Sequence, residues 1–298
     1  MKKVLVLLST YNGEKYLEEL LNSLLVQKGV EINILVRDDG SCDRTTEILK
    51  NYENGNKLKY YEGENIRSLM SFMDLIMQAS LDYDYYAFCD QDDYWEEFKI
   101  QRSIECLSEY DCSIPCLYYS GQKLVDKNLK LLSNHIIDCK RSLESVFIFN
   151  QAAGCTSVFN RALLVKLKKY SPQGIYNHDS WAFKLCVALG GNIFRDASGY
   201  ILYRQHGSNV VGVNNSLLGK IQRSIKLLRN RYTTPYIKQL FNGYDDEIDE
   251  KWKDFLQTIL LSENSAKAKI KLLFNKNIKF NNSFLRIIFY IKVLIGTL

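Results

Sequence analysis

The sequence predicts an α/β fold in which a mostly parallel sheet is flanked by helices and is followed by a helical C-terminal extension. Short apolar runs alternate with segments of helical spacing over the first half of the chain, a pattern typical of a sheet covered on both faces. Several of these runs end in clusters of polar side chains. The composition changes near residues 212–217, where we place the start of the extension.

The first expected strand is the apolar run Val4–Leu8, which is too short for the core of a signal peptide or for a membrane span. Tyr16–Gln27 has helical spacing, with leucines recurring on one face. Asp43 is placed to cap a second helix that continues through Leu49. The other expected strands lie at residues 32–36, 58–61, 85–88, 117–120 and 157–159, and the other expected helices at residues 69–79 and 179–189.

Polar clusters follow the first, second and fourth of these strands, at residues 9–12, 38–41 and 90–93. Ligands of open α/β sheets bind in the crevice beyond the carboxyl ends of the strands. We therefore expect the three clusters to line one crevice. Residues 150–156 are mostly small and suit the close approach of a ligand to the backbone.

Asp90 and Asp92 lie two positions apart where the buried run Tyr85–Phe88 ends. Two carboxylates so placed can converge on one hard cation, and Mg²⁺ or Mn²⁺ is usually held by one or two carboxylates together with substrate phosphates. An acidic turn after a core strand would give the same pattern. From the residues alone, both interpretations stand.

Eight cysteines are scattered through the 298 residues without a disulfide framework. In a chain of this length they indicate reduced, mostly buried thiols and a cytosolic setting. A zinc site formed by Cys106, Cys112 and Cys116 is the alternative that the spacing leaves open.

The C-terminal extension is basic. Residues 217–298 hold 15 Lys and Arg against 7 Asp and Glu, whereas residues 1–216 hold 24 against 27. Its apolar runs alternate with Lys and Arg, most clearly in Ser216–Arg231, Ile270–Phe274 and Phe284–Ile295. Such helices either form a solvated flank of the core or lie on an anionic bilayer. The apolar faces fit a bilayer better than a nucleic acid.

Three ordered motifs, Ser9–Gly13, Arg37–Thr45 and Cys89–Trp95, resemble those of the family 2 glycosyltransferases, which invert the anomeric centre and have a GT-A fold. The resemblance extends through residues 154–161, 177–181 and 203–212, and the Asp-Gln-Asp-Asp and Arg-Gln-His-Gly stretches are most similar to the rhamnosyltransferase-like branch. It covers residues 1–212, the expected glycosyltransferase domain. It does not cover residues 213–298, the basic amphipathic tail.

The resemblance implies a role for each matching residue. The loop with Thr10 and Tyr11 would contact the nucleobase. Asp38 and Asp39 would bind the nucleotide, with Asp39 accepting a hydrogen bond from the imide N–H of uracil or thymine. Asp90 and Asp92 would hold a divalent metal, Mn²⁺ or Mg²⁺, with Asp92 the stronger candidate. The metal would offset the charge that develops on the nucleoside diphosphate.

Asp179 matches the position of the general base, which takes the proton of the acceptor hydroxyl. The helix that begins there is expected to favour the ionised carboxylate and to keep its pKa low. A plain helix-capping role is the alternative. Ser180 stands where relatives often carry a bulky aromatic residue, which leaves the shape of the acceptor site open.

Five further side chains are candidates. His206 would bind the metal or a diphosphate oxygen, or be structural. Arg204 would pair with phosphate or be solvated. Arg67 would reach the diphosphate. Trp95 and Trp181 would stack on a sugar ring or belong to the core.

Together these features predict a metal-dependent inverting glycosyltransferase that transfers a sugar from a nucleotide-sugar, with dTDP-rhamnose or a UDP-hexose such as UDP-galactose as the leading donors. The expected acceptor is a growing surface polysaccharide on a polyprenyl carrier, and no nucleic-acid partner is expected. The expected location is the cytoplasm, peripheral to the inner face of the cell membrane. A nucleotidyltransferase and a non-catalytic carbohydrate-binding or membrane-binding protein are the alternatives.

Overall fold

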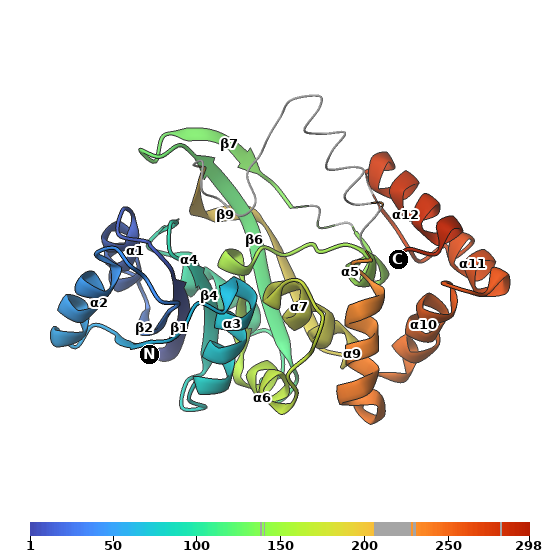
Figure 1. Ribbon diagram of the computed structural model, residues 1–298, viewed down its shortest axis with the longest axis horizontal. Coiled ribbons are helices and arrows are strands. Elements are labelled where there is room, and N and C mark those ends of the chain that lie inside the picture. The colour runs from blue at the N-terminus through green and yellow to red at the C-terminus, as the bar shows by residue number, and fades with distance from the viewer. Residues whose placement is uncertain (138, 140, 206–227, 229–230, 281) are drawn as a thin grey trace.

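The computed structural model describes residues 1–137, 139, 141–205, 228, 231–280 and 282–298. Their strands form one mixed sheet of nine strands, in the order β3-β2-β1-β4-β8-β6-β9-β5, with β7 paired to β6 (Figure 1). Helices cover both faces of this sheet, as the alternation of apolar runs predicted.

The first half of the chain follows the predicted order of strands and helices. Its strands are β1 (Lys2–Thr10), β2 (Val30–Asp38), β3 (Lys59–Glu62) and β4 (Tyr85–Asp90), joined by α1 (Leu17–Leu25), α2 (Thr45–Asn54) and α3 (Arg67–Gln78). These strands pair in parallel, with β1 between β2 and β4. The carboxyl ends of β1, β2 and β4 therefore lie along one edge.

Alternate residues of each central strand belong to different cores. Val4, Val6 and Leu8 pack with α1 and α2, whereas Leu5 and Leu7 pack on the opposite face with α3. This division follows from the two-residue period of a strand, and a strand buried on both faces reads as a continuous apolar run. It explains why the first strand was recognisable as the uninterrupted run Val4–Leu8.

The second half departs from simple alternation. The antiparallel strand β8 (Val158–Asn160) lies between β4 and β6 (Cys116–Val125), and β6 pairs with β7 (Leu131–His135) and β9 (Asn192–Arg204). The short strand β5 (Tyr94–Trp95) joins the far edge of β9. The helical elements here are α4 (Lys99–Leu107), α5 (Glu144–Ile148), η1 (Gly154–Thr156), α6 (Arg161–Lys169) and α7 (His178–Ala188).

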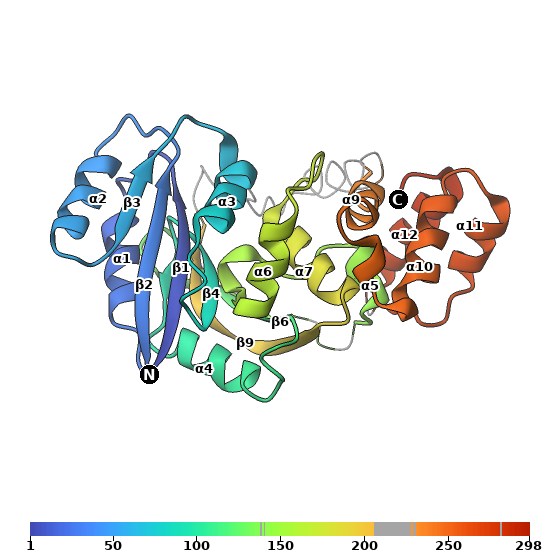
Figure 2. The same cartoon turned by 90° about the horizontal axis from the view of Figure 1, so that it is seen from below.

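The C-terminal extension consists of α9 (Thr234–Tyr244), η2 (Asp245–Glu247), α10 (Glu250–Leu261), α11 (Ala266–Leu273) and α12 (Ser283–Ile295). Figure 2 shows these helices at the end of the molecule away from β1, β2 and β3. Their inner faces join the core of the sheet, because Ile237, Trp252 and Phe289 belong to the same buried cluster as Phe88 and Trp181.

None of the helices described is long and apolar enough to cross a membrane. The predicted apolar and basic stretch at 216–231 falls almost entirely outside the described residues, as does the predicted domain boundary at residue 212.

Candidate active site

The three predicted polar clusters converge at the carboxyl edge of β1, β2 and β4, as expected. The backbone of Tyr11 exchanges two hydrogen bonds with the Gln91 side chain, at 2.7 and 2.9 Å. The N–H of Asn12 donates to Ser41 Oγ at 2.8 Å. Thr10 Oγ1 donates to Asp38 Oδ1 at 2.9 Å. Hydrogen bonds thus join the loop after β1 to the loops after both neighbouring strands.

Thr10 and Asp38 are fully buried and act within this framework. Besides Thr10, Asp38 accepts hydrogen bonds from the hydroxyl and the N–H of Ser41, at 2.6 and 2.8 Å. Thr10 and Asp38 therefore stabilise the loops and are not placed to contact a ligand directly. Their neighbours in the sequence, Tyr11 and Asp39, are better candidates for ligand contacts, and Tyr11 exposes about half of its side chain.

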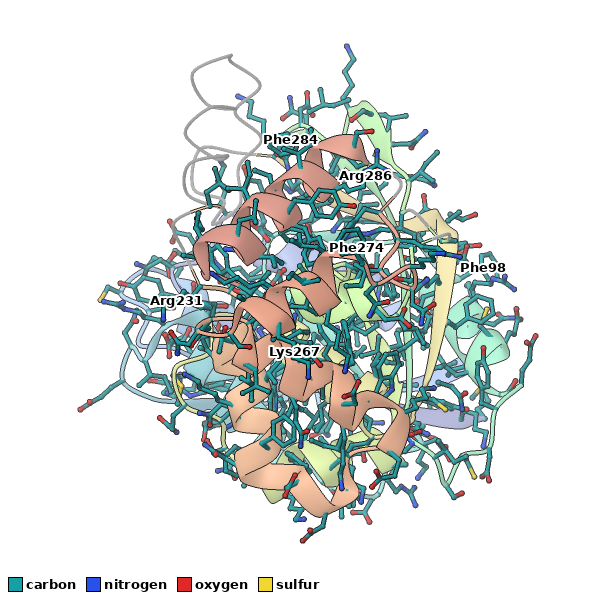
Figure 3. All side chains as sticks on the ribbon, turned by 90° about the vertical axis from the view of Figure 1, so that its right-hand side faces the viewer. Phe98, Arg231, Lys267, Phe274, Phe284 and Arg286 are labelled. Carbon is teal, nitrogen blue, oxygen red and sulfur yellow. The ribbon has the colours of Figure 1, made fainter. Side chains whose placement is uncertain are left out.

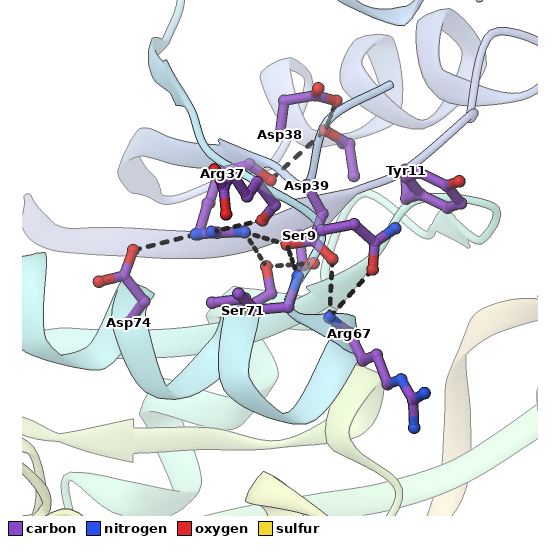
Figure 4. Close-up of polar contacts among 12 residues, drawn as sticks. Ser9, Tyr11, Arg37, Asp38, Asp39, Arg67, Ser71 and Asp74 are labelled. Atoms are coloured by element: carbon purple, nitrogen blue, oxygen red, sulfur yellow. Dashed lines mark hydrogen bonds and ion pairs between the residues drawn. The ribbon is translucent and has the colours of Figure 1, made fainter. Parts of the chain in front are cut away.

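Asp39 is held by a buried network that Figure 4 shows. The Arg37 guanidinium pairs with Asp39 Oδ1, donates from Nε to Asp74 Oδ2 at 3.0 Å and donates from Nη2 to the Glu64 carbonyl at 3.1 Å. The N–H groups of Ile66 and Arg67 donate to the two carboxylate oxygens of Asp39, at 3.2 and 3.0 Å.

Among the residues that the structure describes, these contacts use all but one of the acceptor positions of Asp39. An ionised carboxylate offers about four lone-pair sites. Oδ1 uses two of them, for Arg37 and Ile66, and Oδ2 uses one, for Arg67. The remaining site on Oδ2 can accept one N–H, the number that a uracil or thymine imide offers, although Asp39 is only 2% exposed.

Arg67 contributes its backbone to this network, while its side chain lies elsewhere. It begins α3 with φ of 68°, a left-handed conformation that is uncommon for a residue with a side chain. The guanidinium is exposed and points away from Asp39 (Figure 4). This position leaves it available to an anionic ligand in the crevice.

A group of potential metal ligands lies where β4 ends. One ligand atom from each of Asp90, Asp93 and Cys155 lies within 4.8 Å of the others. Asp92 lies in the same turn, and its charge raises the pKa of both Asp90 and Asp93. The structure therefore adds Asp93 and Cys155 to the predicted pair of Asp90 and Asp92.

Burial and mutual repulsion dominate the electrostatics of this group. Burial, and then the charges of Asp92 and Asp179, raise the pKa of Asp90 to about 7. Burial also raises the pKa of Asp93, whose buried Oδ2 has no hydrogen-bond partner in the described part of the chain. A divalent cation would relieve this repulsion and supply the missing partner, so the residues present fit such an ion.

Two buried cationic side chains, Lys99 and Arg204, lie next to the acidic turn that contains Asp92 and Asp93. Lys99 Nζ lies 3.4 Å from the centre of the Trp95 ring, and burial lowers its pKa to about 8 against the opposing effect of Asp93. The Arg204 guanidinium donates to the carbonyls of Asp92 and Lys127, at 2.9 and 2.6 Å, and pairs with Glu19 at 2.5 Å. Arg204 is 1% exposed, so it organises the Asp92–Asp93 turn rather than presenting its guanidinium to a ligand.

Asp179 lies in the first turn of α7, close enough to Asp90 for its charge to raise the pKa of Asp90. Asp179 Oδ2 accepts hydrogen bonds from the N–H of Gly154 at 3.1 Å and from Asn150 Nδ2 at 3.4 Å. Its Oδ1 accepts the N–H of Ser180 at 2.5 Å, so the carboxylate also satisfies an N–H of the first helical turn.

The prediction that the helix keeps the pKa of Asp179 low is wrong. Burial raises this pKa from its usual range, and the hydrogen bonds from Ser180 and Asn150 and the charge of Lys184 only partly oppose it. Desolvation outweighs the helix dipole because this carboxylate is enclosed by protein atoms. The raised pKa makes Asp179 a stronger base when it is ionised.

The remaining predicted residues are placed as follows. Trp95 and Trp181 are both fully buried, which confirms the core interpretation for each. His206 lies outside the described residues. Among the described residues, the grouping of Asp90, Asp93 and Cys155 is the one that could hold a metal, so the alternative zinc site of Cys106, Cys112 and Cys116 is not formed.

Sequence reasoning missed four contributors to the site. Gln91 clamps the first loop, Arg37 holds Asp39, and Asp93 with Cys155 extends the acidic group. Arg37, Gln91 and Asp93 stand inside the quoted motifs, and Cys155 stands in the small-residue segment 150–156, so their positions were usable signals. The sequence could not show that Cys155 approaches Asp90 and Asp93, because β8 and η1 bring it to β4 from a distant part of the chain.

Comparisons with known proteins agree with this architecture. The profile of Glycosyl transferase family 2 matches residues 5–167. The dTDP-rhamnosyl transferase RfbG of Shigella flexneri is 31% identical over 289 residues, which cover 89% of this chain and 94% of RfbG.

Two solved structures share the fold. TarS 1–349 of S. aureus, in complex with UDP-GlcNAc, matches 98% of this chain and 90% of its own with a TM-score of 0.57 at 19% identity. The mannosyltransferase PcManGT of Pyrobaculum calidifontis, in complex with GDP-Man and Mn²⁺, matches 99% and 85% with a TM-score of 0.57 at 15% identity. The predicted GT-A fold and its rhamnosyltransferase-like resemblance are thus confirmed, and the chain is a glycosyltransferase that belongs to glycosyl transferase family 2.

Proposed function

We propose that this glycosyltransferase is metal-dependent and inverts the anomeric centre as it transfers a sugar from a nucleotide-sugar to a hydroxyl of a growing surface polysaccharide. The observation that carries the proposal is the position of Asp179, which accepts a hydrogen bond from Gly154 next to the group of Asp90, Asp93 and Cys155 at the carboxyl edge of the sheet. One buried carboxylate there can act as a base, and the acidic turn beside it fits a cation.

dTDP-rhamnose and a UDP-hexose such as UDP-galactose are the proposed donors. The vacant acceptor position on Asp39 suits the imide N–H that thymine and uracil share. The similarity to a dTDP-rhamnosyl transferase favours the first donor, and the fold shared with a UDP-GlcNAc complex is compatible with the second. Tyr11, exposed beside this carboxylate, is proposed to stack on the base, and Arg67 to approach the diphosphate.

Asp90 and Asp92 are the proposed ligands of a divalent metal, Mn²⁺ or Mg²⁺, and His206 is retained as a further candidate. When bound, such an ion would offset the negative charge that develops on the departing nucleoside diphosphate. Arg204 holds the turn that carries Asp92 through its contacts with the Asp92 carbonyl and the Asp93 side chain.

Asp179 is the proposed general base. As the acceptor oxygen forms its bond to the anomeric carbon, the bond from that carbon to the diphosphate oxygen breaks and the hydroxyl proton passes to Asp179. The hydrogen bonds from Gly154 and Asn150 hold the carboxylate in one orientation while it receives the proton.

The C-terminal helices supply a surface suited to a membrane-linked acceptor. Figure 3 shows Phe274 and Phe284 on the same face as Lys267 and Arg286. Phe274 is 78% exposed, far more than a core residue. Other large apolar side chains exposed on α10, α11 and α12 are Leu261, Ile270, Ile287, Tyr290, Ile291, Leu294 and Ile295.

An exposed apolar area of this kind, bordered by cations, is typical of a surface that docks on lipid. The sequence left open whether the extension covers the core or docks on a bilayer, and we propose that it does both. Its inner face covers the core, and its outer face rests on the anionic inner leaflet near a polyprenyl-linked acceptor. The proposed domain division, residues 1–212 and 213–298, follows this difference in role. The protein would then act in the cytoplasm, peripheral to the membrane.

A panel of nucleotide-sugars tests the proposal without knowledge of the acceptor. Slow hydrolysis of each donor is measured with Mn²⁺, with Mg²⁺ and with EDTA. We expect turnover of dTDP-rhamnose or a UDP-hexose that requires the metal and is lost in Asp92→Asn, while nucleotide binding without metal persists. Full activity in EDTA would contradict the metal-dependent mechanism.

A further inference from the structure

Two tyrosine rings meet at the surface where the loop before α7 approaches the C-terminal extension. Tyr176 lies three residues before Asp179 in the loop between α6 and α7, and it is 44% exposed. Tyr232 lies two residues before α9 and is partly exposed. The two rings are in edge contact, with their centres 5.0 Å apart and their planes at 67°. Two segments that are far apart in the sequence therefore form one aromatic surface.

The helix α9 holds the loop that carries Tyr176. The hydroxyl of Tyr236 accepts hydrogen bonds from the N–H groups of Tyr176 and Asn177, at 3.1 and 2.8 Å. Gln239 Oε1 accepts the N–H of Gln173 at 3.0 Å. Both partners belong to α9, and Tyr236 is buried. In Figure 2 this loop and the start of α9 lie on the same side of the molecule as the carboxyl ends of β1 and β2.

A second set of contacts joins the aromatic surface to the candidate base. Thr233, the residue after Tyr232, donates a hydrogen bond from Oγ1 to the Ile148 carbonyl at 3.0 Å. Two residues after Ile148, Asn150 donates from Nδ2 to Asp179 Oδ2 at 3.4 Å. Tyr232 is thus tied to the segment that contacts Asp179, and Tyr176 precedes Asp179 in the same short stretch of chain. The tyrosine pair therefore lies beside the candidate base.

Polar groups accompany the two rings. Asn177 is exposed between Tyr176 and α7, and its side chain accepts no N–H from the described helix α7. Asp179 also retains some exposed surface. Small-molecule sites combine aromatic surface with a few polar groups that fix orientation. A sugar ring suits this arrangement, because its C–H groups can pack on an aromatic face while its hydroxyls bind amide and carboxylate groups.

We propose that Tyr176, Tyr232 and Asn177 form a subsite for the sugar residue of the acceptor, whose ring stacks on the tyrosine pair while its reacting hydroxyl faces Asp179. The proposal deepens the proposed function, because it rests on Asp179 receiving the proton of that hydroxyl. Holding the hydroxyl beside the base lowers the entropic cost of the transfer. The C-terminal extension then takes part in selecting the acceptor, since Tyr232 precedes α9 and Tyr236 of α9 holds the loop with Tyr176.

The test uses simple glycosides as probes in place of the acceptor polysaccharide. Saturation-transfer NMR follows the binding of the methyl pyranosides of rhamnose, glucose, galactose and N-acetylglucosamine, each with Mg²⁺ and saturating UDP or dTDP. We expect at least one of these glycosides to bind the wild type. The strongest transfer should reach the C–H protons on one face of its ring, because that face packs on the tyrosines.

Tyr176→Ala and Tyr232→Ala should each weaken the binding of that glycoside by about fivefold or more, because an aromatic contact is lost. Tyr176→Phe keeps the ring and should bind it within about twofold of the wild type. The control is Tyr110→Ala, which removes a partly exposed tyrosine that follows α4, outside the candidate site, and should not change the binding. Thermal unfolding verifies that each variant folds, and two independent alanine variants keep the test valid if one of them folds poorly.

Unchanged glycoside binding in folded Tyr176→Ala and Tyr232→Ala would overturn the inference, as would a wild type that binds none of the glycosides. Loss of UDP or dTDP affinity in place of glycoside affinity would also overturn it, because the tyrosine pair would then serve the donor. The NMR measurement needs no turnover, so it is read even if the wild type transfers no sugar. Absence of turnover across the donor panel would count against the proposed function instead, which keeps the two failures distinct.

Discussion

Asp179 Oδ2 accepts a hydrogen bond from the backbone N–H of Gly154 at 3.1 Å. The next residue after Gly154 is Cys155, whose sulfur lies in the group formed by Asp90 and Asp93. One short segment, η1, therefore fixes the distance between the candidate base and the acidic turn. Changes in this segment should affect catalysis before they affect the fold.

Gly154→Ala tests this link. A Cβ at residue 154 would lie 2.9 Å from His178 Nε2 and 3.5 Å from Asp179 Cβ, so α7 would have to shift. Because displacements of about 1 Å can cost about 10²-fold in rate, we expect kcat to fall at least tenfold with little change in donor affinity. Gly55→Ala is the control, since its nearest neighbour lies at 3.5 Å. Equal loss of activity in both variants would contradict the link.

Arg37→Lys tests the support of Asp39. Arg37 uses three different nitrogens for Asp39, Asp74 and the Glu64 carbonyl, a fork that a lysine cannot reproduce. We expect KM for the donor to rise at least about tenfold, with a smaller effect on kcat, because breaking one buried charged contact typically costs more than about 1.4 kcal/mol. Arg44→Lys serves as control, as Arg44 forms an exposed ion pair with Glu47. Unchanged donor affinity in Arg37→Lys would argue against a role for Asp39 in nucleotide binding.

Asp90→Asn should stabilise the metal-free protein at neutral pH. The folded-state pKa of Asp90 is raised from 3.8 to about 7, so the folded protein binds this proton more tightly than the unfolded chain. Ionisation of Asp90 therefore lowers stability progressively from about pH 4 to pH 7. In EDTA, the Tm of Asp90→Asn should exceed that of the wild type at pH 8. This difference in Tm should become smaller toward pH 5.

Asp126→Asn is the control for this titration. Asp126 is solvated, and the N–H groups of Lys130 and Asn128 lower its pKa. Its removal should give no stabilisation that grows between pH 5 and pH 8. If the difference in Tm between Asp90→Asn and the wild type were the same at pH 5 and pH 8, the fold would not raise the pKa of Asp90.

Ile287→Glu with Leu294→Glu tests membrane docking. Both side chains are exposed on α12, so charging them should leave the core intact while removing apolar area from the lipid-facing side. Because a buried aliphatic side chain contributes about 1.5–3 kcal/mol, co-sedimentation with anionic vesicles should weaken at least tenfold. Binding of the unaltered protein should also weaken with salt.

The control for docking is Val165→Glu, at another exposed apolar position, on α6. It should sediment like the wild type. Equal sedimentation of all three proteins would show that α12 only covers the core, and would leave the family assignment unaffected.

The parts of this fold that the sequence predicted are those governed by local periodicity. Val4–Leu8 and Tyr85–Phe88 were recognisable because a strand buried on both faces is uniformly apolar, and β1 and β4 contain them. The strand β9 was harder to recognise, because most of its residues are half-buried and it makes irregular register shifts against β6. Sheet order at β8 and β5 depends on long-range pairing that no local pattern records.

In the candidate site, too, some features could be predicted from the sequence and others could not. The motifs located Asp39 and Asp90 by residue type and by their place at strand ends, and Asp179 by its place at the start of a helix. They could not show that Arg204 would be buried behind the acidic turn, or that burial would outweigh the helix dipole at Asp179. Both depend on how much water the tertiary packing excludes, which is a property of the assembled fold.

The most direct test of the mechanism is the kinetics of Asp179→Asn with the donor that the panel identifies. Asparagine keeps the shape of the side chain and removes the proton acceptor. We expect kcat to fall by about 10²- to 10⁴-fold, the usual contribution of a general base, while the affinity for the donor stays within about threefold. A collapse of donor affinity with unchanged turnover of the bound donor would contradict the assignment and make Asp179 a donor-binding residue.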